Sequence, residues 1–201
     1  MIGHPPVPLP GPPRSFVLAR GALLVRFYNP THTAGAVDRR FFGPVPTARF
    51  DHHPPPLREH ESESVWYAAS NLRCAVAEAF GKGVIDRQSN RRVALVEARR
   101  DLSLLDLMSV GMRRVGATQE LARTTDYELT QEWARAFYGD RAYRGLRGLR
   151  WRGRQIAAPC IVLTDRAARS VLRMRDDRPI ADPAVWPRIA AAARACRVPV
   201  V

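Results

Sequence analysis

The sequence contains little cysteine, almost no lysine and no long apolar run. Its three cysteines, Cys74, Cys160 and Cys196, are too few and too widely spaced for a disulfide framework or a cysteine-based metal site. No uncharged apolar run reaches the roughly 18 residues that a membrane-spanning helix needs. The N-terminus also lacks the basic start and apolar stretch of a secretory signal. We therefore expect a cytoplasmic protein that does not associate with a membrane.

Several common enzyme motifs are also missing. The chain contains no G-x-G-x-x-G, no Walker loop and no G-x-S-x-G, so the usual arguments for a Rossmann enzyme, an NTPase or an α/β-hydrolase do not apply. The His52–His53 pair has no second cluster of ligands at a useful spacing, and no metal site is predicted.

What the sequence has in abundance is arginine. Lysine and arginine number 32 against 19 acidic residues, which gives a net charge of +13, and Lys82 is the single lysine. Such a field attracts anions: nucleic acid, an acidic protein or a phosphorylated small molecule. The densest basic segment, residues 141–154, holds six arginines around Trp151. Trp151 either stacks on a nucleic-acid base or is the apolar side of a strand whose arginines point outward.

Composition and periodicity divide the chain into a tail and one domain. Residues 1–15 are proline-rich and predict an extended or disordered tail. Residues 16–201 predict a single domain with a core over 21–165 and a helical C-terminal extension over 170–201. Short strands are expected at 21–28, 48–51, 65–67, 92–98, 102–107 and 158–163, and helices at 70–80, 118–123, 126–138 and from Pro183 or Pro187 to Ala195. This irregular order favours an α+β fold, with central short-stranded mixed sheets flanked by helices.

The stretch 64–80 organises the rest of the chain. Its first residues, which include Tyr67, predict a buried strand, and Ser70 is a suitable N-cap for the helix that follows. Gly81 is expected to end that helix. Glu78 falls on the flank of the apolar helix face, about 120° from its centre. A phenol and a carboxylate are therefore expected to face one groove.

Two arginines lie near this stretch in the expected fold. Arg26 interrupts an apolar strand, so it is either buried and paired or ligand-bound, or it lies on the solvent face of an edge strand. Arg49 follows a long loop, residues 29–48, and loops of that length in compact domains are often functional or mobile.

Arg26, Arg49, Tyr67 and Glu78, in this order and spacing, resemble the RES domain family over Gly21 to Asp165. The resemblance is carried by the segments 24–26, 65–70, 77–78, 105–107, 126–134 and 148–154. The family segment with two glycines before an Arg-Trp-Asn is here Thr47-Ala48-Arg49-Phe50-Asp51, and a late family serine falls at Gly153. The serine hydroxyl that would make one polar contact to the substrate is therefore missing. Either Asp51 or a backbone amide replaces that contact, or activity is weakened.

The resemblance implies an ADP-ribosyltransferase-like fold and a toxin that degrades NAD+ by cleaving its nicotinamide–ribose bond. It implies Glu78, Tyr67 and Arg26 as catalytic residues and Arg26, Phe27, Arg49, Asp51, Tyr67 and Gly153 as substrate-binding residues, with NAD+ as substrate and neither a further cofactor nor a metal. Guanidinium groups suit the pyrophosphate, and a carboxylate suits the oxocarbenium-like ribose. The attacking group, water or phosphate, is left open.

The resemblance also implies a partner, a cognate antitoxin of the Xre helix-turn-helix type, through which alone the complex would bind nucleic acid. Two other functions are compatible with the residues. The same fold could transfer ADP-ribose to a protein, or the chain could be a basic nucleic-acid-binding module without catalysis.

Overall fold

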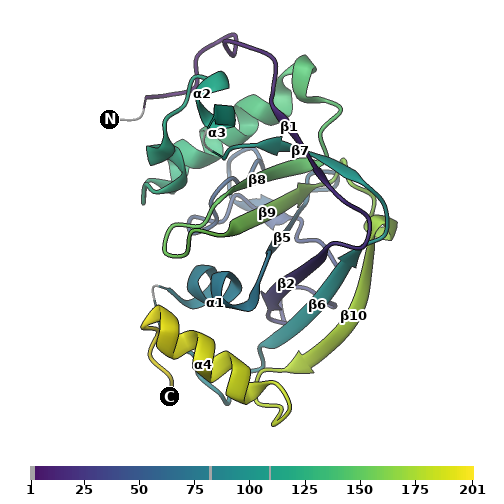
Figure 1. Cartoon of the computed structure of the whole chain (residues 1–201). Coiled ribbons are helices and arrows are strands. Elements are labelled where there is room, and N and C mark those ends of the chain that lie inside the picture. The colour runs from purple at the N-terminus through teal and green to yellow at the C-terminus, as the bar shows by residue number, and fades with distance from the viewer. Residues whose placement is uncertain (1–2, 82, 109) are drawn as a thin grey trace.

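The computed structural model describes residues 3–81, 83–108 and 110–201. Its centre is an eight-stranded sheet in the order β1-β7-β8-β9-β5-β2-β6-β10 (Figure 1). The strands are β1 (Ser15–Leu18), β2 (Leu23–Tyr28), β5 (Val65–Ala69), β6 (Arg92–Ala98), β7 (Leu102–Asp106), β8 (Gly148–Arg152), β9 (Pro159–Thr164) and β10 (Leu172–Pro179). A small second sheet pairs β3 (Phe42–Gly43) with β4 (Arg58–Glu59).

The large sheet is mixed, because β7 and β8 run parallel while the other neighbouring strands run antiparallel. This confirms the predicted α+β class with a mixed sheet. The strand β2 lies between β5 and β6 in the interior of the sheet. The edge-strand interpretation of Arg26 is therefore wrong.

Helices cover the sheet in two groups (Figure 1). At one end, α1 (Leu72–Phe80) packs against α4 (Trp186–Cys196). At the other end lie α2 (Val110–Arg114) and α3 (Tyr127–Gly139). Three short 3-10 helices join these elements: η1 (Gln119–Ala122), η2 (Arg141–Tyr143) and η3 (Arg169–Val171).

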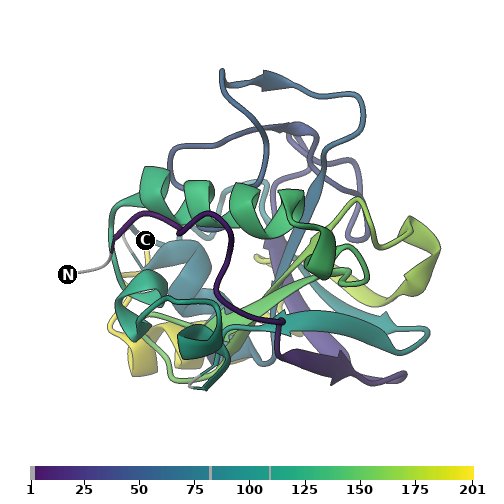
Figure 2. The same ribbon diagram turned by 90° about the horizontal axis from the view of Figure 1, so that it is seen from above.

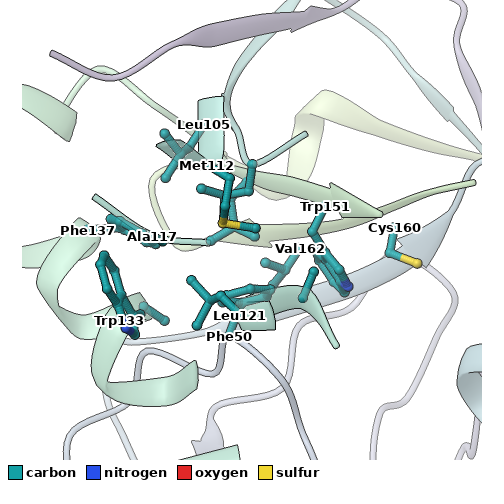
Figure 3. Packing of buried hydrophobic residues seen from close by; sticks show 14 of the residues in the cluster. Phe50, Leu105, Met112, Ala117, Leu121, Trp133, Phe137, Trp151, Cys160 and Val162 are labelled. Atoms are coloured by element: carbon teal, nitrogen blue, oxygen red, sulfur yellow. The ribbon is translucent and has the colours of Figure 1, made fainter. Parts of the chain in front are cut away.

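Apolar side chains form three buried clusters. One lies under α2 and α3, where Phe50, Leu121 and Trp133 pack with residues of β7 to β9 (Figure 3). The second contains side chains of several strands around Trp66. The third lies between α1 and α4. Helix α4 packs mainly on α1, and partly buried Phe27 and Val93 of the sheet pack against the cluster that the two helices form.

The N-terminal tail is extended and runs along α3 (Figure 2). The indole Nε1 of Trp133 donates to the Gly3 carbonyl at 3.0 Å, and Pro10 lies against Gly116. The tail ends in β1, which pairs with β7. The first two tail residues lie outside the described part of the chain.

Three local predictions were wrong. The N-cap of α1 is Asn71, whose side-chain oxygen accepts from the Cys74 amide at 2.9 Å, and not Ser70. Residues 48–51 form a turn in which Phe50 has a φ of 59°, so no strand forms there. The C-terminal extension is not wholly helical, since β10 adds a strand to the edge of the large sheet.

Two further findings complete the fold. Helix α1 ends at Phe80, followed by Gly81 as its C-cap, as the sequence predicts. Within the described ranges, no helix is both long enough and apolar enough to cross a membrane.

Candidate active site

A cavity of about 1020 Å³ opens between α1, the central strands and the loops that follow β2 and β8. Its volume is at the upper end of the range for ligand sites. It has a mixed wall with apolar strand residues and several cationic side chains. The functional candidates that line it are Arg26, Phe27, Arg49, Tyr67 and Glu78, joined by Arg40, Arg91, Tyr127, Arg154 and Gln155.

Glu78 enters the cavity from the last turn of α1. The helix buries Cys74 and Ala75 against the sheet and Val76 in the cluster shared with α4, which leaves Glu78 on a flank that solvent reaches. Its Oε1 accepts a hydrogen bond of 2.9 Å from the backbone N–H of Arg154. Its Oε2 has no hydrogen-bond partner among the residues that the structure describes. One oxygen of the carboxylate is thus fixed and the other is available to a ligand.

The environment of Glu78 raises the pKa of its carboxyl. Removal from bulk water is the main cause, since protein atoms surround the group although the cavity keeps it accessible to solvent. The Arg154 N–H and the positive charges of Arg49 and Arg154 act in the opposite direction. A carboxylate that is partly desolvated in this way interacts more strongly with a cation than one in open water.

Arg49 is held in the cavity wall by backbone carbonyls. Its guanidinium donates to the carbonyls of Leu121 at 3.0 Å and Thr124 at 2.7 Å, and it lies 5.3 Å from the ring centroid of Tyr127. Burial lowers the pKa of Arg49, which nevertheless remains charged at neutral pH. Its charge therefore contributes a positive field to the cavity, while two of its donors are already used.

Tyr67 ties the central strand to the turn that carries Arg49. Its hydroxyl donates to the Arg49 carbonyl at 2.9 Å, and burial raises the pKa of the phenol well above its usual value. The phenol is therefore neutral and unavailable as a base. Tyr67 lines the cavity, so its aromatic ring is available for packing against a ligand.

Arg26 is almost fully buried and lies beneath the loop that follows β2. Its Nη1 donates to the carbonyls of Ala36 at 3.1 Å and Asp38 at 2.8 Å, and its guanidinium packs on the rings of Tyr28 and Trp66. Burial lowers the pKa of Arg26 to about 10. The buried and paired interpretation of Arg26 is confirmed. Neighbouring Phe27 lines the cavity and packs edge-on against Phe80 at 5.1 Å.

Comparison with known proteins identifies this arrangement. The family model described as the RES domain matches residues 26–186, which is more than half of the chain. The chain belongs to the RES domain family. No curated protein matches it.

A solved structure shares the fold of this RES domain. A chain of the crystal structure of the M. tuberculosis MbcT–MbcA toxin–antitoxin complex superposes with a TM-score of 0.59 at 17% identity. The match covers 87% of this chain and 92% of that chain. At this identity the likeness concerns the fold, and it confirms the predicted architecture.

Gly153, at the position of the late serine in the RES family resemblance, lies directly against the carboxylate. A Cβ built on Gly153 would meet Glu78 Oε1 at 3.0 Å, the Ile156 carbonyl oxygen at 2.8 Å and Cys160 Sγ at 3.1 Å. The Ile156 carbonyl is therefore the atom that leaves no room for a Cβ at 153, and Glu78 Oε1 would have to give way slightly. Gly153 itself does not line the cavity, and the amide of the next residue makes the contact to Glu78.

Asp51 does not reach the cavity, contrary to the prediction that it binds substrate. It is fully buried and accepts hydrogen bonds from Arg40 at 2.9 Å, from the Val45 amide at 2.8 Å and from His53 at 2.6 Å. Burial alone would raise the pKa of Asp51, but His53 and Arg40 outweigh that effect and lower it. Its role is to hold the turn behind the cavity wall.

Sequence reasoning did not single out Arg40, Arg91 or Gln155, and it placed Arg154 only in a general basic run. Arg91 packs over Phe80 at 5.0 Å. Arg154 is exposed, and its guanidinium has no partner among the described residues. The one available signal was that Arg154 directly follows Gly153 and closes the last segment of the family resemblance, residues 148–154. Nothing in the spacing of Arg40 or Arg91 distinguishes them from other arginines.

Proposed function

We propose that this RES domain is the toxin of a toxin–antitoxin pair and that it cleaves the nicotinamide–ribose bond of NAD+. The observation that carries the proposal is the Glu78 carboxylate in a cavity of about 1020 Å³ with a cationic wall. One of its oxygens is fixed, and the other has no hydrogen-bond partner among the described residues. Membership of the RES family and the shared fold with a chain of a toxin–antitoxin complex support it.

Glu78 is the residue to which we assign the chemistry. Loss of neutral nicotinamide leaves positive charge on the ribose carbon and ring oxygen, and an ionised carboxylate beside them stabilises that charge. The Arg154 N–H favours the ionised form and holds the carboxylate in place. Water or phosphate then attacks the ribose carbon.

The arginines divide into two roles in this proposal. Arg26 and Arg49 already donate to backbone carbonyls, so they contribute charge and hold the walls. Arg154, whose guanidinium is free of partners among the described residues, offers unused donors to the pyrophosphate. Tyr67 supplies a flat wall on which nicotinamide or its ribose packs.

A toxin that consumes NAD+ needs control inside its host. We propose a cognate antitoxin of the Xre helix-turn-helix type, whose binding covers the cavity with acidic residues set against its arginines. Nucleic acid would then be bound by the antitoxin. In a complex of the two proteins, a cavity left fully open would argue against this form of control.

The test is nicotinamide release from NAD+ by the purified protein, freed of any partner, with and without phosphate. We expect Glu78→Gln to lower turnover by about 10²–10³-fold, the scale of losing one electrostatic stabiliser. The matched control is Glu61→Gln, because Glu61 is exposed and lies outside the cavity. Turnover by Glu78→Gln within about twofold of the unmodified protein would remove Glu78 from the mechanism.

The same preparations separate the competing functions. Transfer of label from NAD+ to a protein band would favour a protein ADP-ribosyltransferase. Steep, salt-dependent binding of nucleic acid by a folded protein that releases no nicotinamide would favour the binding module.

A further inference from the structure

The loop between β8 and β9, residues 153–158, lies against α1. The base of the loop is contacted by Cys74 Sγ, which donates to the Ala158 carbonyl at 3.6 Å, and its tip makes two hydrogen bonds to the C-terminal end of the helix. The backbone N–H of Arg154 donates to Glu78 Oε1 at 2.9 Å, and the side-chain amide of Gln155 donates to the Gly81 carbonyl at 2.9 Å. The Gly153 amide donates to the Ala158 carbonyl at 3.0 Å and closes the base of the loop.

The hydrogen bond from Gln155 provides a partner for a carbonyl at the C-terminal end of α1. The last carbonyls of an α-helix have no partner within the helix, so a donor from elsewhere stabilises the helix end. Gln155 provides that donor at the C-cap of α1. Glu78 lies three residues earlier, about one turn back, so both contacts act on the same turn of the helix.

Few other contacts hold the tip of this loop. Arg154 and Gln155 are exposed, and the hydrogen bonds of their neighbours run within the loop itself. Ile156 and Ala158 pack against the buried cluster and hold the rest of the loop, so Gln155 is the side chain that ties the exposed tip to α1. A Cβ at Gly153 would clash with the Ile156 carbonyl of the same loop and crowd Glu78 Oε1, so the glycine permits this loop conformation beside the carboxylate.

We propose that Gln155 is a positioning residue: its amide anchors the β8–β9 loop to the end of α1, which keeps the Arg154 N–H on Oε1 and leaves Oε2 directed at the substrate. The catalytic meaning of this role rests on the proposed function, but the positioning itself is a property of the substrate-free protein. Through it, the Arg154 backbone amide makes a polar contact with Glu78 directly after the position where the resemblance places a serine.

The charges around Glu78 make this proposal testable by titration. Among the described residues, the groups that face the carboxylate are Arg49 from the turn after the long loop, Arg154 from the β8–β9 loop and the Cys160 thiol from β9. Gln155 carries no charge. Replacing it with a neutral side chain therefore changes the position of the amide without changing the charge of the site.

The experiment compares Gln155→Met, which keeps the length of the side chain and removes its donor, with the control Gln88→Met at an exposed glutamine outside the cavity. The pKa of the Glu78 carboxyl is measured by NMR in ¹³C-glutamate-labelled protein without substrate, and Glu78→Gln assigns the signal. We expect Gln155→Met to raise that pKa by about 0.5 and to move the acid limb of NAD+ cleavage with it. We expect kcat to fall by about three- to tenfold, with KM within about twofold.

A second variant, Gln155→Asn, retains the amide on a shorter side chain and should fall between Gln155→Met and the unmodified protein. An unchanged pKa and an unchanged kcat in Gln155→Met would overturn the proposal. A rise in KM with an unchanged pKa would also overturn it, because Gln155 would then be a substrate contact. If the pKa moves but the unmodified protein releases no nicotinamide, the positioning role stands and the proposed function fails.

Discussion

Two carboxylates in this RES domain, Glu78 and Asp51, have similar neighbours but differ in burial and in the number of hydrogen bonds they accept. Each lies near an arginine, and each is approached by a backbone amide. Asp51 is fully buried and its oxygens are occupied by Arg40, Val45 and His53. Glu78 is reached by solvent, and only its Oε1 has a partner among the described residues.

The hydrogen-bond partners of each carboxylate oxygen therefore distinguish a structural residue from a candidate functional one. A buried carboxylate whose donors all come from the protein fixes a conformation. A carboxylate in a large cavity with an oxygen that accepts no hydrogen bond from the described residues can take a donor from a ligand. The two arginines follow the same rule: Arg40 is paired with Asp51, whereas the Arg154 guanidinium has no partner in the described part of the chain.

The largest effect on stability is expected at Asp51. Asp51→Ala leaves Arg40, His53 and the Val45 amide without their acceptor, so we expect the free energy of unfolding to fall by about 3–5 kcal/mol. Chemical denaturation followed by circular dichroism measures the change. Glu78→Gln is the matched comparison, because it alters a carboxylate that no buried partner requires, and we expect no loss of stability. Equal stability of Asp51→Ala and the unmodified protein would show that the buried cluster is dispensable.

The sequence could predict elements whose residues alternate or repeat along one segment. The strand at 92–98 and the helix that ends before Gly81 were found in this way, because burial on one face leaves a periodic pattern. The strand β10 was missed since most of its residues are exposed and charged. Its pairing with β6 is supported instead by cross-strand ion pairs, Arg175 with Glu97 and Arg92 with Asp177.

The turn at 48–51 was missed for a different reason. Ala48 to Asp51 has the composition of a strand, but Phe50 adopts a left-handed φ of 59° that composition rarely signals. Its ring is buried against Trp151, which comes from a strand about a hundred residues later in the chain (Figure 3). Tertiary contacts of this kind override local preference.

The candidate site shows the same limit. The resemblance pointed to Arg26, Arg49, Tyr67 and Glu78, and the structure brings all four to one cavity. Whether a polar group is free or already paired depends on residues far away in the chain, such as the carbonyl of Thr124 for Arg49. No pattern within one segment carries that information, so Asp51 was placed in the site and Arg154 was not singled out.

A smaller effect is expected at Gly153, which lies next to the Glu78 carboxylate in the β8–β9 loop. A Cβ in Gly153→Ala would approach the Ile156 carbonyl at 2.8 Å and Glu78 Oε1 at 3.0 Å, so the loop must shift. We expect a loss of about 1–3 kcal/mol in unfolding free energy, together with a fall in NAD+ turnover that exceeds the effect of the stability loss. Gly145→Ala is the control, because a Cβ there meets no atom within 4 Å. Full activity and stability in Gly153→Ala would mean that the loop does not depend on the close approach.

The smallest expected effect concerns the pH dependence of the unfolding free energy, to which the two carboxylates contribute with opposite sign. The pKa of Asp51 is lowered in the folded protein, so the stability it provides is present above the ordinary pKa of aspartate and is lost as pH falls through its folded value. The pKa of Glu78 is raised by burial, so its ionised form costs stability above the folded pKa, and that cost disappears as pH falls below the ordinary value for glutamate. The deficit of Asp51→Ala should therefore shrink on acidification, and so should the advantage of Glu78→Gln over the unmodified protein. The measurement is the unfolding free energy of the unmodified protein, Asp51→Ala and Glu78→Gln across the acidic range.

Because solvent reaches Glu78, the stability of Glu78→Gln relative to the unmodified protein should change less with pH than that of Asp51→Ala. A Glu78→Gln variant that is less stable than the unmodified protein at neutral pH would contradict a desolvated carboxylate in the cavity.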